Sequence, residues 1–111
     1  MKKTLFAVLS LSLIALSARA EVDKKTERTW KAKCASCHGA DGKGDTKMGK
    51  KLAAKDYTDP AVQAALKDDA AFKAIKEGLK DKEGKVLMKP AEETSDEDIK
   101  ALVAYMRTFK K

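Results

Sequence analysis

Both cysteines and the only histidine of this 111-residue chain lie within five consecutive positions, as Cys34, Cys37 and His38. Residues three and four positions apart share one face of a helix, so this spacing directs two thiols and an imidazole to the same side. No other cysteine or histidine occurs in the sequence. Any fold proposed for the chain therefore has to bring these three side chains to a common site.

The first twenty residues have the features of a cleavable export signal. Two lysines follow the first methionine, an apolar stretch covers residues 5–16, and Ala-Arg-Ala at 18–20 matches a signal-peptidase site. The apolar stretch is shorter than the roughly twenty residues that span a bilayer, and an uncleaved membrane anchor is the alternative. We therefore expect a signal peptide over residues 1–20 and a single domain over residues 21–111, with periplasmic localisation and no stable membrane insertion after cleavage.

The domain has few large side chains with which to build a core. Its aromatic residues are Trp30, Tyr57, Phe72, Tyr105 and Phe109. Small domains with thin cores usually depend on disulfides, a metal or a bulky cofactor. A Cys34–Cys37 disulfide would close a loop too short to restrict the unfolded chain much, so it would stabilise the fold little. The composition therefore indicates a bulky group within the core.

The charge balance excludes one class of partner. Basic residues outnumber acidic residues by 24 to 17, and the first twenty residues hold three of the basic ones and no acidic one. In the rest of the chain acids and lysines are interspersed, and no concentrated basic face with aromatic stacking positions is evident. Nucleic-acid binding is therefore not expected.

The pattern of apolar, glycine and proline residues predicts an all-α fold with no strand. Glycines mark loops, and a proline suits the first turn of a helix. The predicted elements are a helix over residues 23–37, a glycine-containing loop to about residue 53, a short helix opened by Asp59-Pro60, a helix over residues 69–79 and a loop over residues 80–94.

The last helix has the clearest signals. Ser95, followed three residues later by Asp98, resembles a capping box. Apolar side chains then recur at helical spacing, and they are Ile99, Leu102, Val103, Met106 and Phe109. This spacing predicts a buried stripe along the helix.

Four kinds of site could use the arrangement of Cys34, Cys37 and His38. A structural zinc site needs four protein ligands and a catalytic one about three, and the chain has no second Cys/His pair. A thioredoxin-like redox pair belongs in a strand-to-helix setting. A plain disulfide leaves the histidine and the thin core unexplained. Covalent haem explains all of these features, because the thiols add to the two vinyl groups and the histidine binds the iron, so the motif favours one haem c per chain.

The sequence resembles the class I c-type cytochromes. The resemblance is carried by "KCASCHG", by the glycine-containing loop after it and by "SDEDIKALVAYMRTF" near the end, and it covers essentially residues 21–111. It implies a small cytochrome c fold, in which the N- and C-terminal helices cross and shorter helices and loops surround one covalent haem. It also implies that Trp30, an aromatic residue four positions before the first cysteine, packs at this crossing with Tyr105 as its partner.

Two positions depart from the family pattern. Thr26 stands where the family often has a glycine at the helix crossing. The family also often has a proline after the attachment loop, whose carbonyl accepts the ring N–H of the histidine, whereas no proline occurs here before Pro60. Another carbonyl within residues 45–49 is therefore expected to orient the His38 ring.

The sixth ligand of the iron is expected from a methionine, since no second histidine exists. Met106 lies on the apolar stripe and is predicted to be part of the core. Met48 follows His38 by only ten residues, which leaves little chain to reach the other side of the haem. Met88 lies fifty residues past His38, in the loop where the family has its axial methionine. The resemblance therefore implies His38 and Met88 as metal ligands, with Met48 or an open or water-ligated iron as alternatives.

These ligands predict an electron-transfer protein rather than an enzyme. A histidine and a thioether on opposite sides of the iron leave no open position for a substrate. The alternatives are a small haem enzyme or gas sensor with an open sixth position, and a haem subunit of a larger complex. We expect a monomer that exchanges electrons with redox partner proteins.

Lysines are concentrated in the two loops expected to border the haem. They are Lys43, Lys47, Lys50, Lys51 and Lys55 in one loop, and Lys80, Lys82, Lys85 and Lys89 in the other. They indicate either an ordinary solvated surface or a basic ring that attracts partners with acidic docking surfaces.

Overall fold

The computed structural model describes residues 24–110, so the expected signal peptide over residues 1–20 lies outside the described residues. A first helical stretch runs through residues 24–29, the π-helical segment η1 (Trp30–Cys34) and α2 (Ala35–His38). The other elements are α3 (Lys47–Leu52), α4 (Pro60–Ala65), α5 (Asp68–Glu77), β1 (Leu79–Lys80), β2 (Val86–Met88) and α6 (Asp96–Arg107). Among the described residues, none of the helices has the length and apolar character needed to cross a membrane.

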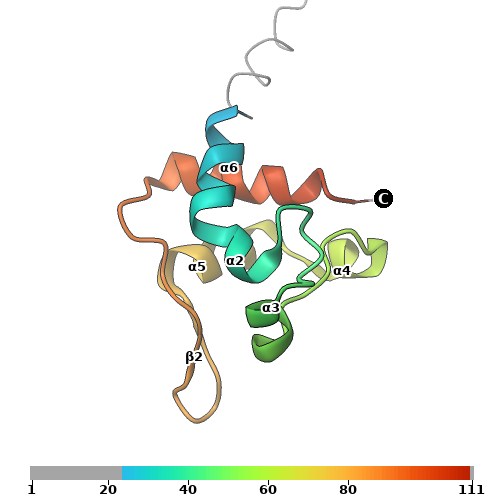
Figure 1. Ribbon diagram of the computed structural model, residues 1–111. Coiled ribbons are helices and arrows are strands. Elements are labelled where there is room, and N and C mark those ends of the chain that lie inside the picture. Colours follow the sequence, from blue (N-terminus) through green and yellow to red (C-terminus); the bar gives the residue numbers. More distant parts are fainter. Residues whose placement is uncertain (1–23, 111) are drawn as a thin grey trace, which may run out of the picture.

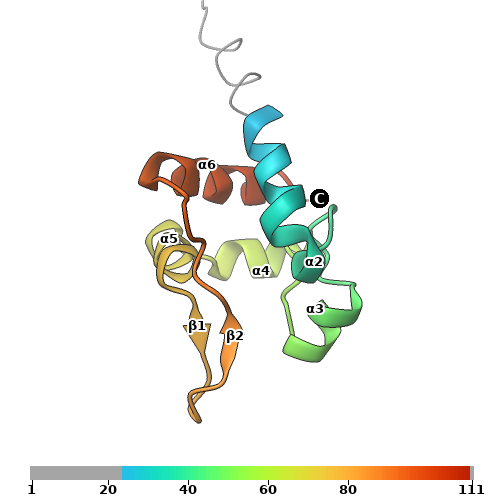
Figure 2. The same ribbon diagram turned by 60° about the vertical axis from the view of Figure 1, so that its left-hand side comes forward.

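The first helical stretch crosses α6, as Figures 1 and 2 show. Trp30 is only 2% exposed and lies at this crossing, with ring centroids 5.8 Å from Tyr105 and 5.2 Å from Phe109. Thr26, in the position where the family often has glycine, is also buried. The predicted crossing of the terminal helices and the pairing of Trp30 with Tyr105 are confirmed.

A π-helical turn precedes the Cys34-x-x-Cys37-His38 motif. The Ala35 N–H donates to the carbonyl oxygen of Trp30, five residues back instead of the usual four. Such single turns inside α-helices are frequent at functional sites. The predicted helix over residues 23–37 is thus confirmed where it is described, with a local change of winding where the motif begins.

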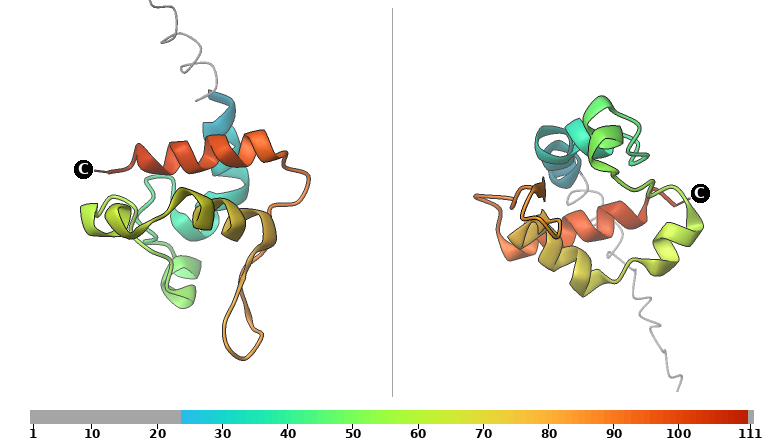
Figure 3. Two further views of the ribbon diagram at one scale, coloured as in Figure 1. Left: turned by 180° about the vertical axis from the view of Figure 1, so that it is seen from behind. Right: turned by 90° about the horizontal axis from the view of Figure 1, so that it is seen from below.

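The helix α6 begins and packs as predicted. The Ser95 hydroxyl oxygen accepts a hydrogen bond from the Asp98 N–H at 3.1 Å, while the Asp98 carboxylate pairs with Lys25 of the first helix at 3.3 Å. The buried residues of the core are Trp30, Tyr57, Ala71, Ile75, Ile99, Leu102, Val103 and Met106. Four of them belong to the predicted stripe of α6, and Phe109 packs against this core from just beyond the helix. Figure 3 shows α5 alongside α6.

In the middle region α3 is a correction, because it lies in the stretch up to about residue 53 that was predicted to be a loop. The helices α4 and α5 agree with the predicted pattern apart from one end. The Asp59 carboxylate accepts a hydrogen bond from the Ala61 N–H at 2.9 Å, and Pro60 is the first residue of α4. The next helix, α5, ends at Glu77 because Gly78 follows with a φ of +82°, a conformation that L-residues avoid. The prediction that this helix extends to residue 79 was therefore wrong by about half a turn.

The hairpin formed by β1 and β2 contradicts the expectation of a fold without strands. The two short strands are antiparallel, and Leu79 pairs with Met88. In the connecting turn the Asp81 carboxylate accepts hydrogen bonds from two later N–H groups at 2.9 Å each, and Gly84 has a φ of +85°. Strands of two and three residues are too short to show an alternating pattern. Figure 2 shows this hairpin extending away from α6, in a fold that remains dominated by helices.

A buried polar network fixes α4 against the end of α6. The Gln63 side chain is 5% exposed, and its amide nitrogen donates to the carbonyl oxygens of Tyr57 at 2.7 Å and Met106 at 2.8 Å. The Arg107 guanidinium donates to the Gln63 amide oxygen at 3.1 Å and to the Leu66 carbonyl at 2.6 Å. These bonds satisfy the buried amide and position the segment that carries Tyr57.

Candidate functional site

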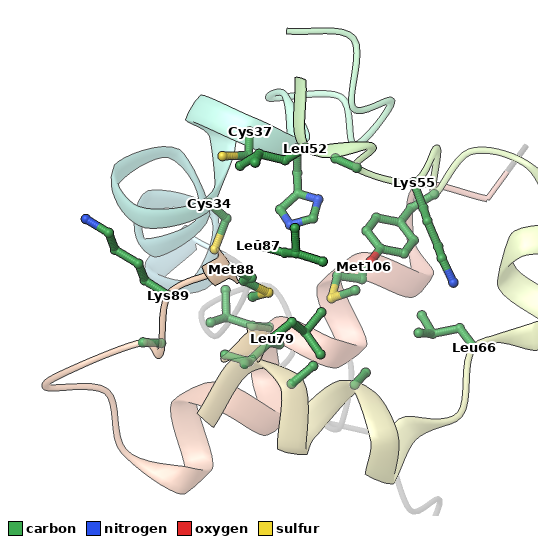
Figure 4. Close-up of a pocket in the computed structure, with 18 of the residues that line it drawn as sticks. Cys34, Cys37, Leu52, Lys55, Leu66, Leu79, Leu87, Met88, Lys89 and Met106 are labelled. Atoms are coloured by element: carbon green, nitrogen blue, oxygen red, sulfur yellow. The ribbon is translucent and has the colours of Figure 1, made fainter. Parts of the chain in front are cut away.

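A cavity of about 830 Å³ lies between the first helix, α3, α5, the hairpin and α6. Figure 4 shows Leu52, Leu66, Leu79 and Leu87 around it, so its walls are largely apolar. Its volume falls within the range of about 300–1,000 Å³ that small-molecule and cofactor sites occupy. The cavity can therefore hold a sizeable apolar group.

The two cysteines line this cavity as half-buried, free thiols. Burial raises the pKa of Cys34 to about 11, so this thiol is protonated at neutral pH. A reactive dithiol pair instead has a lowered thiol pKa, and a structural disulfide would join the two sulfurs. Within residues 24–110 no group of three or more His, Cys, Asp and Glu side chains is placed so that it could bind a metal ion.

The imidazole of His38 lies between two aromatic rings at the cavity. Its ring centroid is 5.6 Å from that of Trp30 and 5.6 Å from that of Tyr57. Burial lowers the pKa of His38, which favours the neutral imidazole that binds metal ions. Its Nδ1 is buried without a hydrogen-bond partner among the described residues, so the expected acceptor within residues 45–49 is not found. Nε2 is left as the nitrogen available to the cavity.

All three methionines weighed as iron ligands line the cavity. Met88 is half-buried on β2, and Figure 4 shows its thioether on the cavity side. Met106 is 5% exposed, so its predicted place in the core is confirmed, although it also forms part of the cavity wall. Met48, on α3, is 42% exposed. The structure therefore brings Met88 to the same cavity as His38.

The segment that contains Met88 is fixed by contacts that the sequence did not reveal. A Cβ added to Gly78 would lie 2.6 Å from the Met88 carbonyl oxygen, so only glycine allows this close packing. The Ala91 N–H donates to the Ile75 carbonyl at 2.8 Å. Both contacts tie the chain around Met88 to the end of α5. In the sequence, Gly78 was the one indication of these contacts, and by itself it indicates only the end of a helix.

Lysines border the cavity, and none of the described residues that line it is acidic. These lysines are Lys33, Lys55, Lys67 and Lys89. Lys55 and Lys89 belong to the two predicted lysine-rich loops, and Figure 4 shows both at the cavity. Lys33 and Lys67 were not among the predicted residues, because their proximity to the cavity depends on the tertiary structure.

The residues of this cavity fit a covalently attached haem. Apolar walls suit a large flat macrocycle, and two thiols and an imidazole with one open nitrogen line the same cavity. Thioether side chains come from other elements. This donor set of thiols, imidazole and thioether is the one by which c-type haem is attached and ligated.

Comparisons with known proteins agree with this description. The family model described as cytochrome c matches residues 24–110. A solved structure of the KustC0563 c-type cytochrome is similar with a TM-score of 0.66 and 34% identity, covering 78% of this chain and 98% of that one. A tyrosine-to-phenylalanine mutant of Kustc0563 is similar with a TM-score of 0.63 and 34% identity, covering 77% and 98%. No curated protein matches the chain.

The family match covers all of the described residues, and the motif, the crossing helices and the apolar cavity occur together within it. From this evidence we conclude that the chain belongs to the cytochrome c family, whose members transfer electrons by means of covalently bound haem.

Proposed function

We propose that this protein is a periplasmic electron carrier that binds one haem per chain, with His38 and Met88 as the axial ligands of the iron. The observation that carries the proposal is that one apolar cavity is lined both by the Cys34, Cys37 and His38 motif and by Met88 from the hairpin. The periplasmic location is supported by the signal-like sequence of residues 1–20.

These four residues have three distinct tasks. Cys34 and Cys37 would retain the group through thioether bonds, so that it does not dissociate between electron transfers. His38 supplies a neutral ring nitrogen, and Met88 a thioether that favours the reduced iron and raises the potential. Haem bound in this way supplies reversible one-electron chemistry, and two occupied axial positions leave no site for a substrate.

The packing of the three methionines favours Met88 as the ligand. Met48 lies on α3, which is joined to the motif helix by a 2.8 Å hydrogen bond from the Thr46 hydroxyl to the Cys37 carbonyl. Its helix is therefore anchored to the end of the motif helix, and its side chain is 42% exposed. Met106 is a core residue of α6. Met88 comes from a separate element and is only half-buried, so its thioether is available to a group in the cavity.

The substitution Met88→Ala tests this ligation. It would remove the sulfur and admit water or another weak ligand. We expect the oxidised spectrum to lose its weak far-red sulfur-to-iron band, the potential to fall, and the reduced protein to bind carbon monoxide readily. Absorption spectroscopy, redox titration and carbon monoxide binding measure these three changes.

Met48→Ala and Met106→Ala are the matched controls. Both should keep the far-red band, although Met106→Ala should cost about 2–5 kcal/mol of stability because the side chain is buried. Loss of the band in Met48→Ala but not in Met88→Ala would transfer the ligand role to Met48. A wild-type protein that lacks the band and binds carbon monoxide freely would instead be an enzyme or gas sensor with an open iron.

The lysines that border the cavity suggest the kind of redox partner. Lys55, Lys67 and Lys89 make no ion pair within residues 24–110, and no acidic residue accompanies them among the residues that line the cavity. We propose that they attract partners with acidic docking surfaces to the cavity mouth. This arrangement would speed encounter more than it would strengthen the complex.

A further inference from the structure

The His38 ring is packed between aromatic side chains from two distant parts of the chain. Trp30 precedes it in the first helix, and Tyr57 lies in the segment before α4. Both rings are tilted relative to the imidazole, by 37° and 38°, and both have centroids 5.6 Å away. Contacts of this kind restrict rotation of the imidazole about the bond that joins it to the chain.

The first of these rings is itself immobilised. The Trp30 indole N–H donates to the Gly39 carbonyl oxygen at 2.9 Å, and the side chain is 2% exposed. Tyr105 and Phe109 pack against its other edges. Trp30 therefore contacts His38 as a fixed part of the helix crossing.

The second ring is fixed through its backbone. The Tyr57 N–H donates to the Gly42 carbonyl at 2.8 Å, and the Tyr57 carbonyl accepts from the Gln63 amide at 2.7 Å. The side chain is 9% exposed. Both hydrogen bonds join the Tyr57 backbone to other parts of the protein. They therefore hold Tyr57 beside His38 without any contribution from a bound group.

Carbonyl groups near His38 are already engaged elsewhere. The Cys37 carbonyl accepts from the Thr46 hydroxyl at 2.8 Å, the His38 carbonyl from the Gly44 N–H at 2.7 Å, and the Gly39 carbonyl from Trp30. The ring nitrogen Nδ1 is buried and has no partner among the described residues. This differs from the usual metal-bound histidine, whose second ring N–H is bonded to a carboxylate, a carbonyl or water.

We propose that the plane of the His38 imidazole is set by packing between the Trp30 and Tyr57 rings and that no protein group within residues 24–110 accepts a hydrogen bond from its Nδ1–H. The inference rests on the proposed binding of iron by His38. Tyr57 is then a positioning residue for His38, and its ring also lines the cavity. An acceptor at Nδ1 would make the imidazole a stronger donor, so its absence favours the reduced iron and a higher potential.

The ring of Tyr57 is tested by comparing Tyr57→Leu with Tyr57→Phe in the haem-loaded protein. The measurement is the proton NMR spectrum of the oxidised protein. In it, the spread of chemical shifts among the haem methyl groups depends on the orientation of the axial imidazole. Tyr57→Leu removes the flanking ring and should change this spread. Tyr57→Phe keeps the ring and should retain the wild-type spread.

Phe72→Leu is the matched control for general loosening of the core. Phe72 packs against the core but does not line the cavity, so this variant should lower the melting temperature without changing the methyl spread. An unchanged spread in Tyr57→Leu would overturn the proposal. So would an equal change in Tyr57→Phe, which would assign the effect to the hydroxyl group.

Whether the His38 Nδ1–H donates a hydrogen bond is tested in the reduced wild-type protein. No substitution is needed, so the result does not depend on the folding of a variant. We expect the ¹⁵N-labelled Nδ1–H to show no coupling across a hydrogen bond to a carbonyl carbon. A measured coupling to a carbonyl would overturn the proposal. If His38 does not bind iron, its ring protons will lack haem-induced shifts in the wild type, so failure of the ligation is distinguished from failure of the packing.

Discussion

The side chain of Lys33 connects the motif helix to the segment that follows Met88. Its ammonium group donates to the Glu92 carbonyl oxygen at 2.8 Å and to the Thr94 hydroxyl at 3.0 Å. Glu93, between these two partners, has a φ of +56°, so the turn has an unfavourable backbone conformation that local packing must maintain. Lys33 is adjacent to Cys34, and it therefore ties the turn beyond Met88 to the helix that carries the thiols.

Substituting Lys33→Met should loosen the Met88 segment while keeping the aliphatic part of the side chain. We expect a loss of stability of about 1 kcal/mol, because these are hydrogen bonds of an exposed group. We also expect faster carbon monoxide binding to the reduced protein and faster hydrogen exchange of the amides in residues 89–95. Lys31→Met, which removes the 3.0 Å ion pair with Glu27 on the same helix, should change neither rate. Equal rates in the two variants would show that Lys33 does not restrain Met88.

At the scale of secondary structure, α3 depends on one glycine. Thr46 caps this helix by accepting from the Gly49 N–H at 2.8 Å, and the same hydroxyl donates to the Cys37 carbonyl. A Cβ on Gly49 would overlap the carbonyl oxygens of Cys37 and Gly44. The helix was not predicted, because the two apolar side chains among its six residues, Met48 and Leu52, are too few to establish a helical period and its position comes from this contact with the end of the motif.

Gly49→Ala should therefore destabilise the protein although alanine is the better helix former. Helix propensity alone predicts a gain of about 1 kcal/mol, whereas forcing atoms into a packed site costs about 1–3 kcal/mol. We expect the steric cost to dominate, since the neighbours are backbone oxygens, and denaturant unfolding measures the difference. A stabilised Gly49→Ala variant would contradict the tight packing of α3 against the motif.

The end of α3 offers the opposite control. Ala53 terminates the helix with a φ of +58°, a left-handed conformation that favours glycine. Ala53→Gly relieves this strain, partly offset by the greater freedom of glycine in the unfolded chain, so it should stabilise the protein by up to about 1 kcal/mol. Both expected results run against helix propensity: the variant with the added alanine should be less stable, and the variant with the added glycine should be more stable.

At the scale of the whole molecule, the cavity is too large for a domain with so small a core. A pocket of about 830 Å³ whose walls are largely apolar leaves those side chains in contact with water unless a bulky group fills it. Small domains with thin cores usually depend on such a group. We therefore expect the fold to depend on the covalently bound group as part of its core.

The double substitution Cys34→Ser and Cys37→Ser, expressed together with a haem-attachment system, should consequently yield little folded protein. Circular dichroism and thermal melting measure this outcome. A haem-free variant with normal helical content and a cooperative melting transition would show that the protein side chains suffice for the core.

The proposed docking surface predicts a salt dependence that belongs to the molecule as a whole. The rate of electron transfer with an acidic partner should fall as ionic strength rises past about 0.1 M, where the screening length is about 10 Å. Lys55→Gln and Lys89→Gln should lower the rate at low salt, whereas Lys100→Gln on α6, away from the cavity, should not. A rate that is independent of salt would identify the lysines as an ordinary solvated surface.

The sequence alone was sufficient for the features that depend on neighbouring residues. The spacing of Cys34, Cys37 and His38, the proline at the start of α4 and the cap and stripe of α6 all involve residues a few positions apart. Helical geometry and capping chemistry relate such residues directly, so the two helices could be predicted from local patterns. Their crossing was predicted from the family resemblance. The signal peptide, the axial role of Met88 and the acidic partners remain predictions.

Only the tertiary structure decided which residues surround the cavity. Tyr57 was predicted merely as one of few aromatic residues, yet its ring lies against His38, and Lys33 contacts a turn about sixty positions away. The hairpin that carries Met88 closes through the side chain of Asp81 and is too short for a periodic signal. Contacts between residues distant in the chain depend on how the helices pack, and a pattern of local spacing contains no information about that packing.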